Sequence, residues 1–303
     1  ELAYFNSFFE TGLKSPLDDA LLEHQEIDAK GWHKVDEVPF DFERRRVSVL
    51  LENATGRLLV VKGAPEDVLR LSESCEAEGD TRALDPAARA AITAVFEGLS
   101  KEGFRVLGIA SRSVGMDHPH AVVGDESALV FAGFAAFLDP PKESAKQALA
   151  ELAAGGVTVK IVTGDNELVT QHICAELGMP VTGVLTGADI QELDDHALQA
   201  KAERANLFCR VAPAQKNRVI LALKQRGHVV GYLGDGINDA PALHSADIGI
   251  SVESAVDVAK ASAAMILLEH DLGVLQAGVL EGRRTFGNIM KYIMMGTSSN
   301  FGN

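Results

Sequence analysis

Beyond residue 142 the chain alternates short apolar segments with helical patterns, and this alternation constrains the fold more than any other feature. Such alternation is typical of a doubly wound parallel sheet with right-handed crossovers. Ligands of these sheets bind at the carboxyl ends of the strands. The pattern predicts helix 143–154, strand 157–162, helix 167–177, a strand near Val184, helix 189–204, strand 206–210, helix 213–226, strands 228–233 and 248–251, helix 253–262, strand 264–268 and a long C-terminal helix.

The first half of the chain has a different pattern, typical of an antiparallel α+β unit. Two prolines in Asp139-Pro-Pro-Lys142 stiffen the chain where the pattern changes, so we predict domains at 1–136 and 137–303. The expected elements are a helical region 2–22 broken at 12–16, strands 40–51 and 57–62 joined by a turn at 53–56, a helix from Pro65, a polar loop 76–86, helix 87–101, and strands 105–111 and 128–138.

Composition excludes several classes of partner. A formal charge of −15 argues against nucleic acid and against an anionic membrane surface. Phosphate recognition therefore has to rely on a few placed cations and on backbone amides. Three distant cysteines indicate buried free thiols in a reducing compartment. Glu1 lies inside a helical pattern and the Met-rich stretch 286–303 has no stop signal, so we expect a piece of a longer protein.

The ten residues GDGINDAPAL, 234–243, follow the predicted strand 228–233. Asp235 and Asp239 lie around the turn at its carboxyl end, and Asn238 or Asp239 is predicted to cap the next helix. One or two carboxylates, with water and phosphate completing the shell, are a usual protein environment for Mg²⁺. The alternative is a capped turn with solvated acids. Two acids, two glycines and Asn238 in ten residues favour the magnesium site.

Other polar residues lie where neighbouring strands end or helices begin. Thr163-Gly164-Asp165 offers a hydroxyl and two backbone amides to a phosphoryl group, although taken alone the segment favours a simple helix cap. Lys216 lies one turn into the predicted helix 213–226, and Arg210 ends a predicted strand; each alone would be an ordinary solvated cation. No P-loop or dinucleotide motif is present.

Taken in order, these motifs resemble the cytoplasmic part of P-type cation-transporting ATPases, which belong to the haloacid-dehalogenase superfamily. The segments that carry the resemblance are Lys62-Gly-Ala-Pro-Glu66, Asp139-Pro-Pro-Lys142, Thr163-Gly-Asp165, Val211-Ala-Pro-Ala-Gln-Lys216 and GDGINDAPAL. Within that family, the flanking sequence resembles the bacterial magnesium-importing branch. The segments that carry this finer resemblance are Phe40-Asp-Phe-Glu-Arg-Arg-Arg46, Leu17-Asp18 and 291–303.

The resemblance implies an ATP-driven pump with ATP and Mg²⁺ as cofactors. Residues 1–136 would be its nucleotide-binding domain and 137–303 its phosphorylation domain. The transmembrane and actuator domains of the same full-length protein would be partners, in the bacterial inner membrane, with this portion in the cytoplasm. The implied nucleotide contacts are Asp18, Phe40 (stacked on adenine), Lys62, Gly63, Arg105, Asp139 and Arg210; those to the phosphoryl group are Thr163, Gly164, Asp165, Lys216, Asn238 and Asp239; those to magnesium are Asp235 and Asp239.

One departure from the family pattern changes what this chain can do. The family's nucleophile is the aspartate of a DKTGT segment on the central strand of the sheet, and the 303 residues contain no such segment. We therefore expect a gap beside the strand that ends at Asp235, and no aspartyl-phosphate on this polypeptide alone. The alternatives are a soluble phosphohydrolase of the same superfamily with 1–136 as its cap domain, a pump for another cation, and a non-enzymatic nucleotide-binding module.

Overall fold

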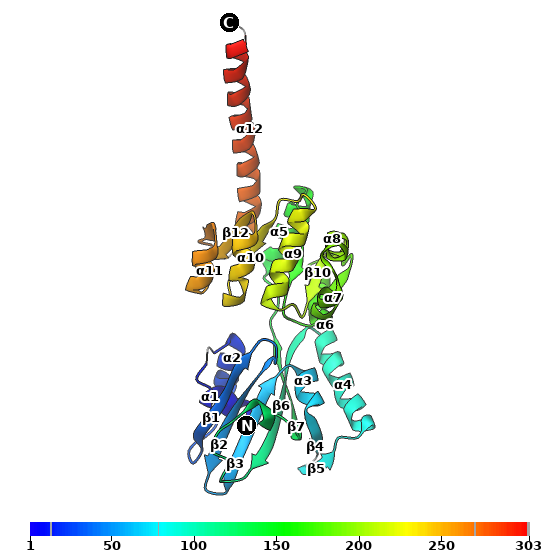
Figure 1. Ribbon diagram of the computed structural model, residues 1–303, viewed down its shortest axis with the longest axis vertical. Helices are drawn as coiled ribbons and strands as arrows, with labels where there is room; N and C mark the ends of the chain where they lie inside the picture. Colours follow the sequence, from blue (N-terminus) through cyan, green and yellow to red (C-terminus); the bar gives the residue numbers. More distant parts are fainter. Residues whose placement is uncertain (13, 78, 270, 302–303) are drawn as a thin grey trace. The chain divides into compact units, whose positions relative to one another are not determined.

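The computed structural model describes residues 1–12, 14–77, 79–269 and 271–301. It divides into two compact units, Glu1–Asp139 and Pro140–Asn303 (Figure 1). The division falls inside the segment with two prolines. Each unit buries apolar clusters of its own. The assignment of 1–136 to nucleotide binding and of 137–303 to phosphorylation stays a prediction.

Unit 1 is built on a seven-stranded sheet with the order β1-β2-β3-β6-β7-β4-β5, in which only β4 and β7 pair in parallel among the described strands. Its elements are α1 Leu2–Phe9, α2 Pro16–His24, β1 His33–Asp41, β2 Arg46–Asn53, β3 Gly56–Gly63, α3 Pro65–Arg70, β4 Ser72–Ala77, β5 Asp80–Ala83, α4 Pro86–Lys101, β6 Phe104–Val114, η1 Val123–Asp125 and β7 Leu129–Leu138.

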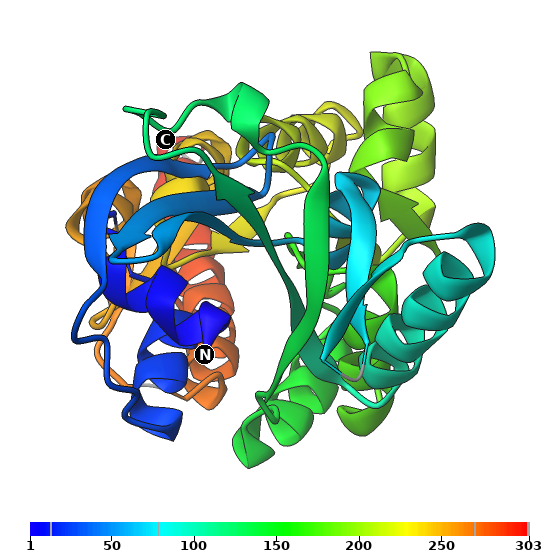
Figure 2. The same ribbon diagram turned by 90° about the horizontal axis from the view of Figure 1, so that it is seen from below.

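The two faces of this sheet are covered by different helices (Figure 2). Side chains alternate along a strand, so Val49 and Leu51 of β2 pack with Phe5 of α1, whereas Leu50 joins the cluster that contains Val68 of α3. Helix α4 packs on this second cluster. The sheet therefore lies between α1 and α2 on one face and α3 and α4 on the other.

Unit 2 contains parallel strands and helices, as predicted, so the α/β class is confirmed. Its strands form two three-stranded sheets, β8-β10-β9 and β11-β12-β13, rather than one. Its elements are α5 Glu143–Ala154, β8 Ile161–Val162, α6 Glu167–Glu176, β9 Val184–Thr186, α7 Gly187–Glu192, α8 Asp195–Arg204, β10 Leu207–Cys209, α9 Pro213–Gln225, β11 Gly231–Leu233, η2 Ile237–Asp239, α10 Ala240–Ser245, β12 Ile248–Val252, α11 Asp257–Ser262, β13 Met265–Leu267 and α12 Gly273–Phe301.

The split leaves β8 and β11 at sheet edges. Among the described strands, β8 pairs only with β10, and β11 pairs only with β12. The two halves are joined by α9, whose Val219 packs with the first sheet and whose Ile220 packs with Tyr232 of β11. Helix α12 runs beyond the rest of unit 2 (Figure 1). None of the helices in the described ranges is long and apolar enough to cross a membrane.

Two expectations for unit 1 are wrong. The predicted strand 40–51 is interrupted by a turn between β1 and β2, in which the Asp41 carboxylate accepts hydrogen bonds from the amides of Glu43 and Arg44, and Arg45 has φ 54°. The predicted loop 76–86 contains β5 and most of its hairpin with β4. Exposed hairpins lack apolar alternation, so their sequences resemble loops.

Several expectations for unit 2 are corrected in detail. Helix 189–204 is two helices, because the Asp194 carboxylate caps α8 by accepting from Ala197 N. Strands 157–162 and 228–233 pair only over 161–162 and 231–233, and helix 253–262 begins at Asp257. Neither Asn238 nor Asp239 caps α10 through its side chain, because η2 precedes that helix and the Asp239 carboxylate is engaged elsewhere.

Candidate functional site

A strongly hydrogen-bonded carboxylate of unit 2 follows the carboxyl end of β11. The Asp239 carboxylate accepts 2.7 Å hydrogen bonds from Lys216 Nζ and from the Tyr232 hydroxyl at Oδ1, and one of 3.1 Å from Gly236 N at Oδ2. Asp239 is 7 % exposed. Helix α9, strand β11 and the turn that follows it therefore converge on one carboxylate.

Burial and hydrogen bonding act in opposite directions on this carboxylate. Burial raises the pKa of Asp239, but the hydrogen bonds from Lys216 and Tyr232 and the charge of Lys216 outweigh it and hold the pKa below its usual value. Burial, together with the hydrogen bond to Asp239, raises the pKa of the Tyr232 hydroxyl. The group is thus an ionised carboxylate with a protonated phenol and an ammonium.

The rest of GDGIND is more open. Asp235 is exposed and its carbonyl accepts a hydrogen bond from Val256 N, whereas Asn238 is half-buried in η2. Gly234 is required sterically, because a Cβ there would lie 2.6 Å from the Asp239 Cβ. The glycine therefore lets the buried Asp239 fold back against the strand end. Asp235 then projects from the same turn into solvent.

The second group of predicted residues lies where β8 and β10 end. Thr163 Oγ1 and the Asp165 carboxylate are 3.1 Å apart, and Thr163 Oγ1 also accepts from Asp165 N. The amide of Arg210 donates to the Asp165 carbonyl, and Arg210 Nε donates to Glu167. Helix α6 begins after them and is capped by the Asn166 side chain. The helix-cap alternative for Thr163 and Asp165 is therefore wrong.

In unit 1, the structure brings Asp18 and Lys62 together although they are far apart in the sequence. Lys62 Nζ pairs with the Asp18 carboxylate, and it lies 3.1 Å from Glu10 Oε2 and 2.8 Å from Ser7 Oγ. All of these side chains are buried. Gly63 follows directly, and a Cβ there would collide with Arg46 Cβ and with the Arg45 carbonyl. The Lys62-Gly63 segment thus passes tightly against the β1–β2 turn.

The other predicted residues of unit 1 are exposed. Phe40 is 51 % exposed, and its ring meets that of Phe42 edge-on with centroids 5.0 Å apart. Arg105 Nη1 lies 3.7 Å from an Asp139 oxygen, and both of these side chains are exposed. An aromatic face in solvent and a partly exposed guanidinium are suited to contact a ligand.

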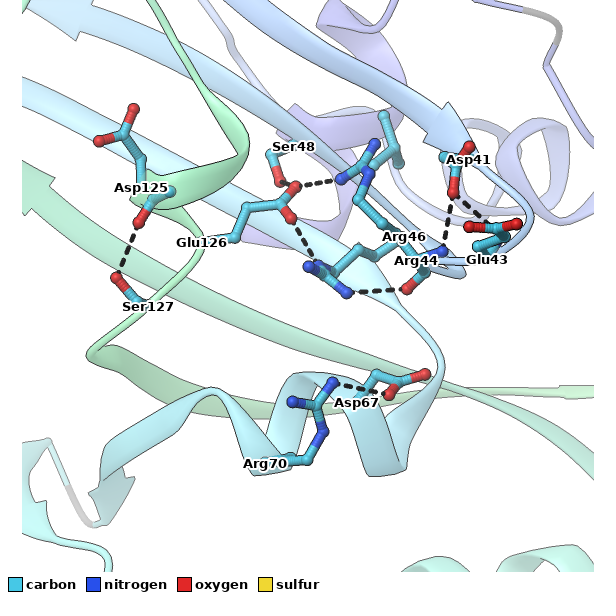
Figure 3. Close-up of polar contacts among 12 residues, drawn as sticks. Asp41, Glu43, Arg44, Arg46, Ser48, Asp67, Arg70, Asp125, Glu126 and Ser127 are labelled. Atoms are coloured by element: carbon cyan, nitrogen blue, oxygen red, sulfur yellow. Dashed lines mark hydrogen bonds and ion pairs between the residues drawn. The ribbon is translucent and has the colours of Figure 1, made fainter. Parts of the chain in front are cut away.

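Sequence reasoning missed several residues that hold these groups in place. Tyr232 reads as an ordinary aromatic of an apolar strand, and Ser7 and Glu10 read as surface positions of a helical segment. A cluster of four residues was also missed, namely the half-buried Arg44 and the buried Arg46, Ser48 and Glu126 (Figure 3). Glu126 follows an exposed segment, so only the three consecutive arginines 44–46 signalled that a carboxylate lies near.

Comparisons with known proteins agree with the order of these groups. A family model described as P-type ATPase, cytoplasmic domain N, matches residues 3–144, and one described as haloacid dehalogenase-like hydrolase matches residues 116–247. The two matches overlap at residues 116–144, a stretch that contains the division between the units. The first model thus covers nearly all of unit 1, and the second covers the end of unit 1 and much of unit 2.

The chain is similar to much longer proteins over nearly all of its own length. It is 48 % identical to the magnesium-transporting ATPase, P-type 1, of Escherichia coli (strain K12) and to that of Salmonella typhimurium (strain LT2), over 99 % of this chain and 34 % of each relative. It is 37 % identical to the probable cation-transporting ATPase F of Mycobacterium tuberculosis (strain H37Rv), over 88 % of this chain and 30 % of that protein. The chain thus spans about a third of these relatives and is homologous to the cytoplasmic portion of P-type ATPases.

Proposed function

We propose that this chain is the ATP-binding and phosphorylation portion of a magnesium-transporting P-type ATPase that works through an aspartyl-phosphate. Unit 1 binds ATP, and unit 2 positions the phosphoryl group. The assignment of magnesium as the transported ion rests on the relatives. Those named as magnesium-transporting are 48 % identical to this chain, and the one named only as cation-transporting is 37 % identical. In the full-length protein, the partners of this portion would be an actuator domain and transmembrane domains in the bacterial inner membrane. This portion itself would lie in the cytoplasm.

The observation that carries the proposal is the Lys216–Asp239 pair at the carboxyl end of β11. Phosphoryl transfer to a carboxylate brings several negative oxygens together, so catalysis consists mainly of positioning and charge neutralisation. Lys216 Nζ lies 2.7 Å from Asp239 and its side chain is 14 % exposed, so Asp239 fixes the ammonium while one side stays open to solvent. We propose that this side faces the phosphoryl group, with Thr163, Gly164 and Asp165 as further contacts.

The two aspartates differ in their suitability for magnesium. Both oxygens of Asp239 already accept hydrogen bonds from the protein, whereas Asp235 is exposed at the strand end, as a carboxylate that shares an ion with water and phosphate must be. Asp235 therefore fits as the principal magnesium ligand. Asp239 would complete the site by holding Lys216, and Asn238 by its place in the turn. The ion would offset charge on phosphoryl oxygens.

In unit 1, Phe40 is the proposed platform for adenine. A half-exposed ring offers a π face for stacking. The side chains of Arg105 and Asp139 are partly exposed, and Arg105 would contact phosphate oxygens. Lys62 and Asp18 are buried, so we propose that they support the site from beneath, together with Gly63. Arg210 belongs to unit 2, where its pair with Glu167 fixes the end of β10.

Titration of ATP against the 303-residue chain tests this function. We expect Phe40→Ala to weaken binding by about tenfold, equivalent to about 1.4 kcal/mol of lost stacking. Phe8→Ala is the matched control, because Phe8 is 47 % exposed on α1 of the same unit. A soluble phosphohydrolase whose first unit is a cap would show equal affinities for wild type and Phe40→Ala. That result would remove the proposed nucleotide site.

A further inference from the structure

Among the carboxylates that the structure describes in unit 1, Glu126 is the most completely buried, and the proposed ATP site does not use it directly. Its side chain has no exposed surface. Oε1 accepts 2.6 Å bonds from Arg44 Nη1 and Ser48 Oγ, and Oε2 accepts one of 2.6 Å from Arg46 Nε (Figure 3). A buried carboxylate with two guanidiniums fixes their geometry closely, because each planar fork has a few allowed positions.

The fork of Arg44 reaches the backbone next to Phe40. While Nη1 binds Glu126, Nη2 donates a 2.5 Å hydrogen bond to the Pro39 carbonyl. The Asp41 carboxylate holds the amide of Arg44, and Arg46 Nη1 donates to the Arg44 carbonyl. The residues on both sides of Phe40 are therefore tied, through Arg44, to a carboxylate that lies 82 positions away in the sequence.

We infer that Arg44 and Glu126 are positioning residues that hold Phe40 for stacking on the adenine ring. This inference rests on the proposed ATP site of unit 1. Phe40 is half-exposed, and Phe42, whose ring it meets edge-on, is exposed as well, so side-chain packing alone holds Phe40 weakly. The Arg44 bridge supplies the missing constraint through the backbone, and a preorganised ring loses less entropy on binding.

Arg44→Lys separates this role from a general effect on folding. A lysine keeps the charge beside Glu126 but cannot reach both Glu126 and the Pro39 carbonyl, and Arg46 still pairs with the carboxylate. The matched control is Arg112→Lys, because Arg112 binds the carbonyls of Asp125 and Ser127, the residues on either side of Glu126, through hydrogen bonds that do not involve the turn 39–46. Both variants are compared in the full 303-residue chain.

We expect Arg44→Lys to weaken ATP binding by about fivefold, Arg112→Lys to leave it unchanged, and Arg44→Lys to have no further effect in a Phe40→Ala background. In the nucleotide-free protein, amide exchange at Phe40 and Asp41 should be faster in Arg44→Lys alone. Full affinity in Arg44→Lys, or a loss that adds to that of Phe40→Ala, would overturn the inference and leave the ATP site intact. Absence of ATP binding by the wild type would refute both.

Discussion

The Tyr232 hydroxyl and the Lys216 ammonium each lie 2.7 Å from the same oxygen of Asp239. The phenol comes from β11, the strand that precedes the GDGIND turn, and the ammonium comes from α9, so Asp239 joins two consecutive elements of the chain. Charge-assisted bonds of this length are among the stronger ones in proteins. The position of the Lys216 ammonium therefore depends on Asp239 and, through Asp239, on Tyr232.

Tyr232→Phe removes one bond of that arrangement and nothing else. Because the native pKa of Asp239 is lowered, its ionised form adds stability above the unfolded pKa of about 3.9, and this contribution is lost as the pH falls through the native pKa. We expect the variant to be less stable by about 1.5 kcal/mol at pH 7 and to approach the wild type as the pH falls through the lowered native pKa of Asp239.

Urea unfolding at a series of pH values measures this difference. Tyr292→Phe is the control, because Tyr292 is 77 % exposed on α12 of the same unit, and it should match the wild type throughout. A destabilisation by Tyr232→Phe that is the same at pH 7 and at pH 3 would show that the hydroxyl does not act through Asp239.

Lys216→Met leaves the buried Asp239 without its cation. We expect the free energy of unfolding to fall by about 3 kcal/mol at pH 7, because breaking a buried pair leaves an uncompensated charge. Lys224→Met on the same helix is the comparison, since its pair with Asp247 is a third exposed on both sides and should cost less than about 1 kcal/mol. Equal losses, measured by urea unfolding, would place Lys216 among ordinary surface cations.

Glu10 and Asp18 share the Lys62 ammonium, yet their pKa values move in opposite directions. Burial raises the pKa of Glu10 by more than Lys62 lowers it. Burial acts on Asp18 as well, but there Lys62 and Ser15 outweigh it and the pKa is lowered. Ionised Asp18 therefore stabilises unit 1 at neutral pH, whereas ionisation of Glu10 works against folding.

Two isosteric variants separate these carboxylates. We expect Asp18→Asn to lower the free energy of unfolding by about 3 kcal/mol at pH 7 and Glu10→Gln to leave it unchanged or higher. A raised native pKa gives stability that is present below the unfolded value, about 4.3 for Glu, and lost as the pH rises through the native value. Glu10→Gln should therefore gain relative to the wild type as the pH rises above about 4. A large loss of stability in Glu10→Gln at pH 7 would contradict the assignment of opposite roles to the two carboxylates.

Phosphorylation gives a prediction for the chain as a whole. The 303 residues contain no DKTGT segment, so we expect no acid-stable, hydroxylamine-labile phosphoprotein after incubation with labelled ATP and Mg²⁺. A full-length relative treated in parallel is the positive control. Label that survives acid and is released by hydroxylamine would show that another carboxylate of this chain accepts the phosphoryl group.

Local sequence signals predicted the elements that begin and end with distinctive residues. Pro65 and Pro213 lie at the first positions of α3 and α9, and the alternation beyond residue 142 gave the order of elements in unit 2. The turn between β1 and β2 was missed because no Gly or Pro occurs between Asp41 and Arg46. The Asp41 side chain makes that turn by binding two amides, a weaker signal in the sequence.

In the candidate site, too, contacts between separate elements could not be predicted from local sequence. The sequence motifs identified Asp239 and Lys216, but the contribution of Tyr232 depends on strand register and on the packing of α9 against β11. The pair of Lys62 with Asp18 arises only when α1 and α2 pack on the sheet. Unit 2 is split into two sheets with β11 at an edge, the strand beside which the sequence led us to expect a gap. The full set of strand pairings in the two sheets is not defined by periodicity.

The central claim is that this chain recognises ATP by its adenine ring in unit 1, and comparison of ATP with inorganic triphosphate tests it most directly. Isothermal titration of the 303-residue chain should show ATP binding at least about tenfold more tightly than triphosphate. In Phe40→Ala this preference should largely disappear. Equal affinities of the wild-type chain for ATP and triphosphate would contradict the account.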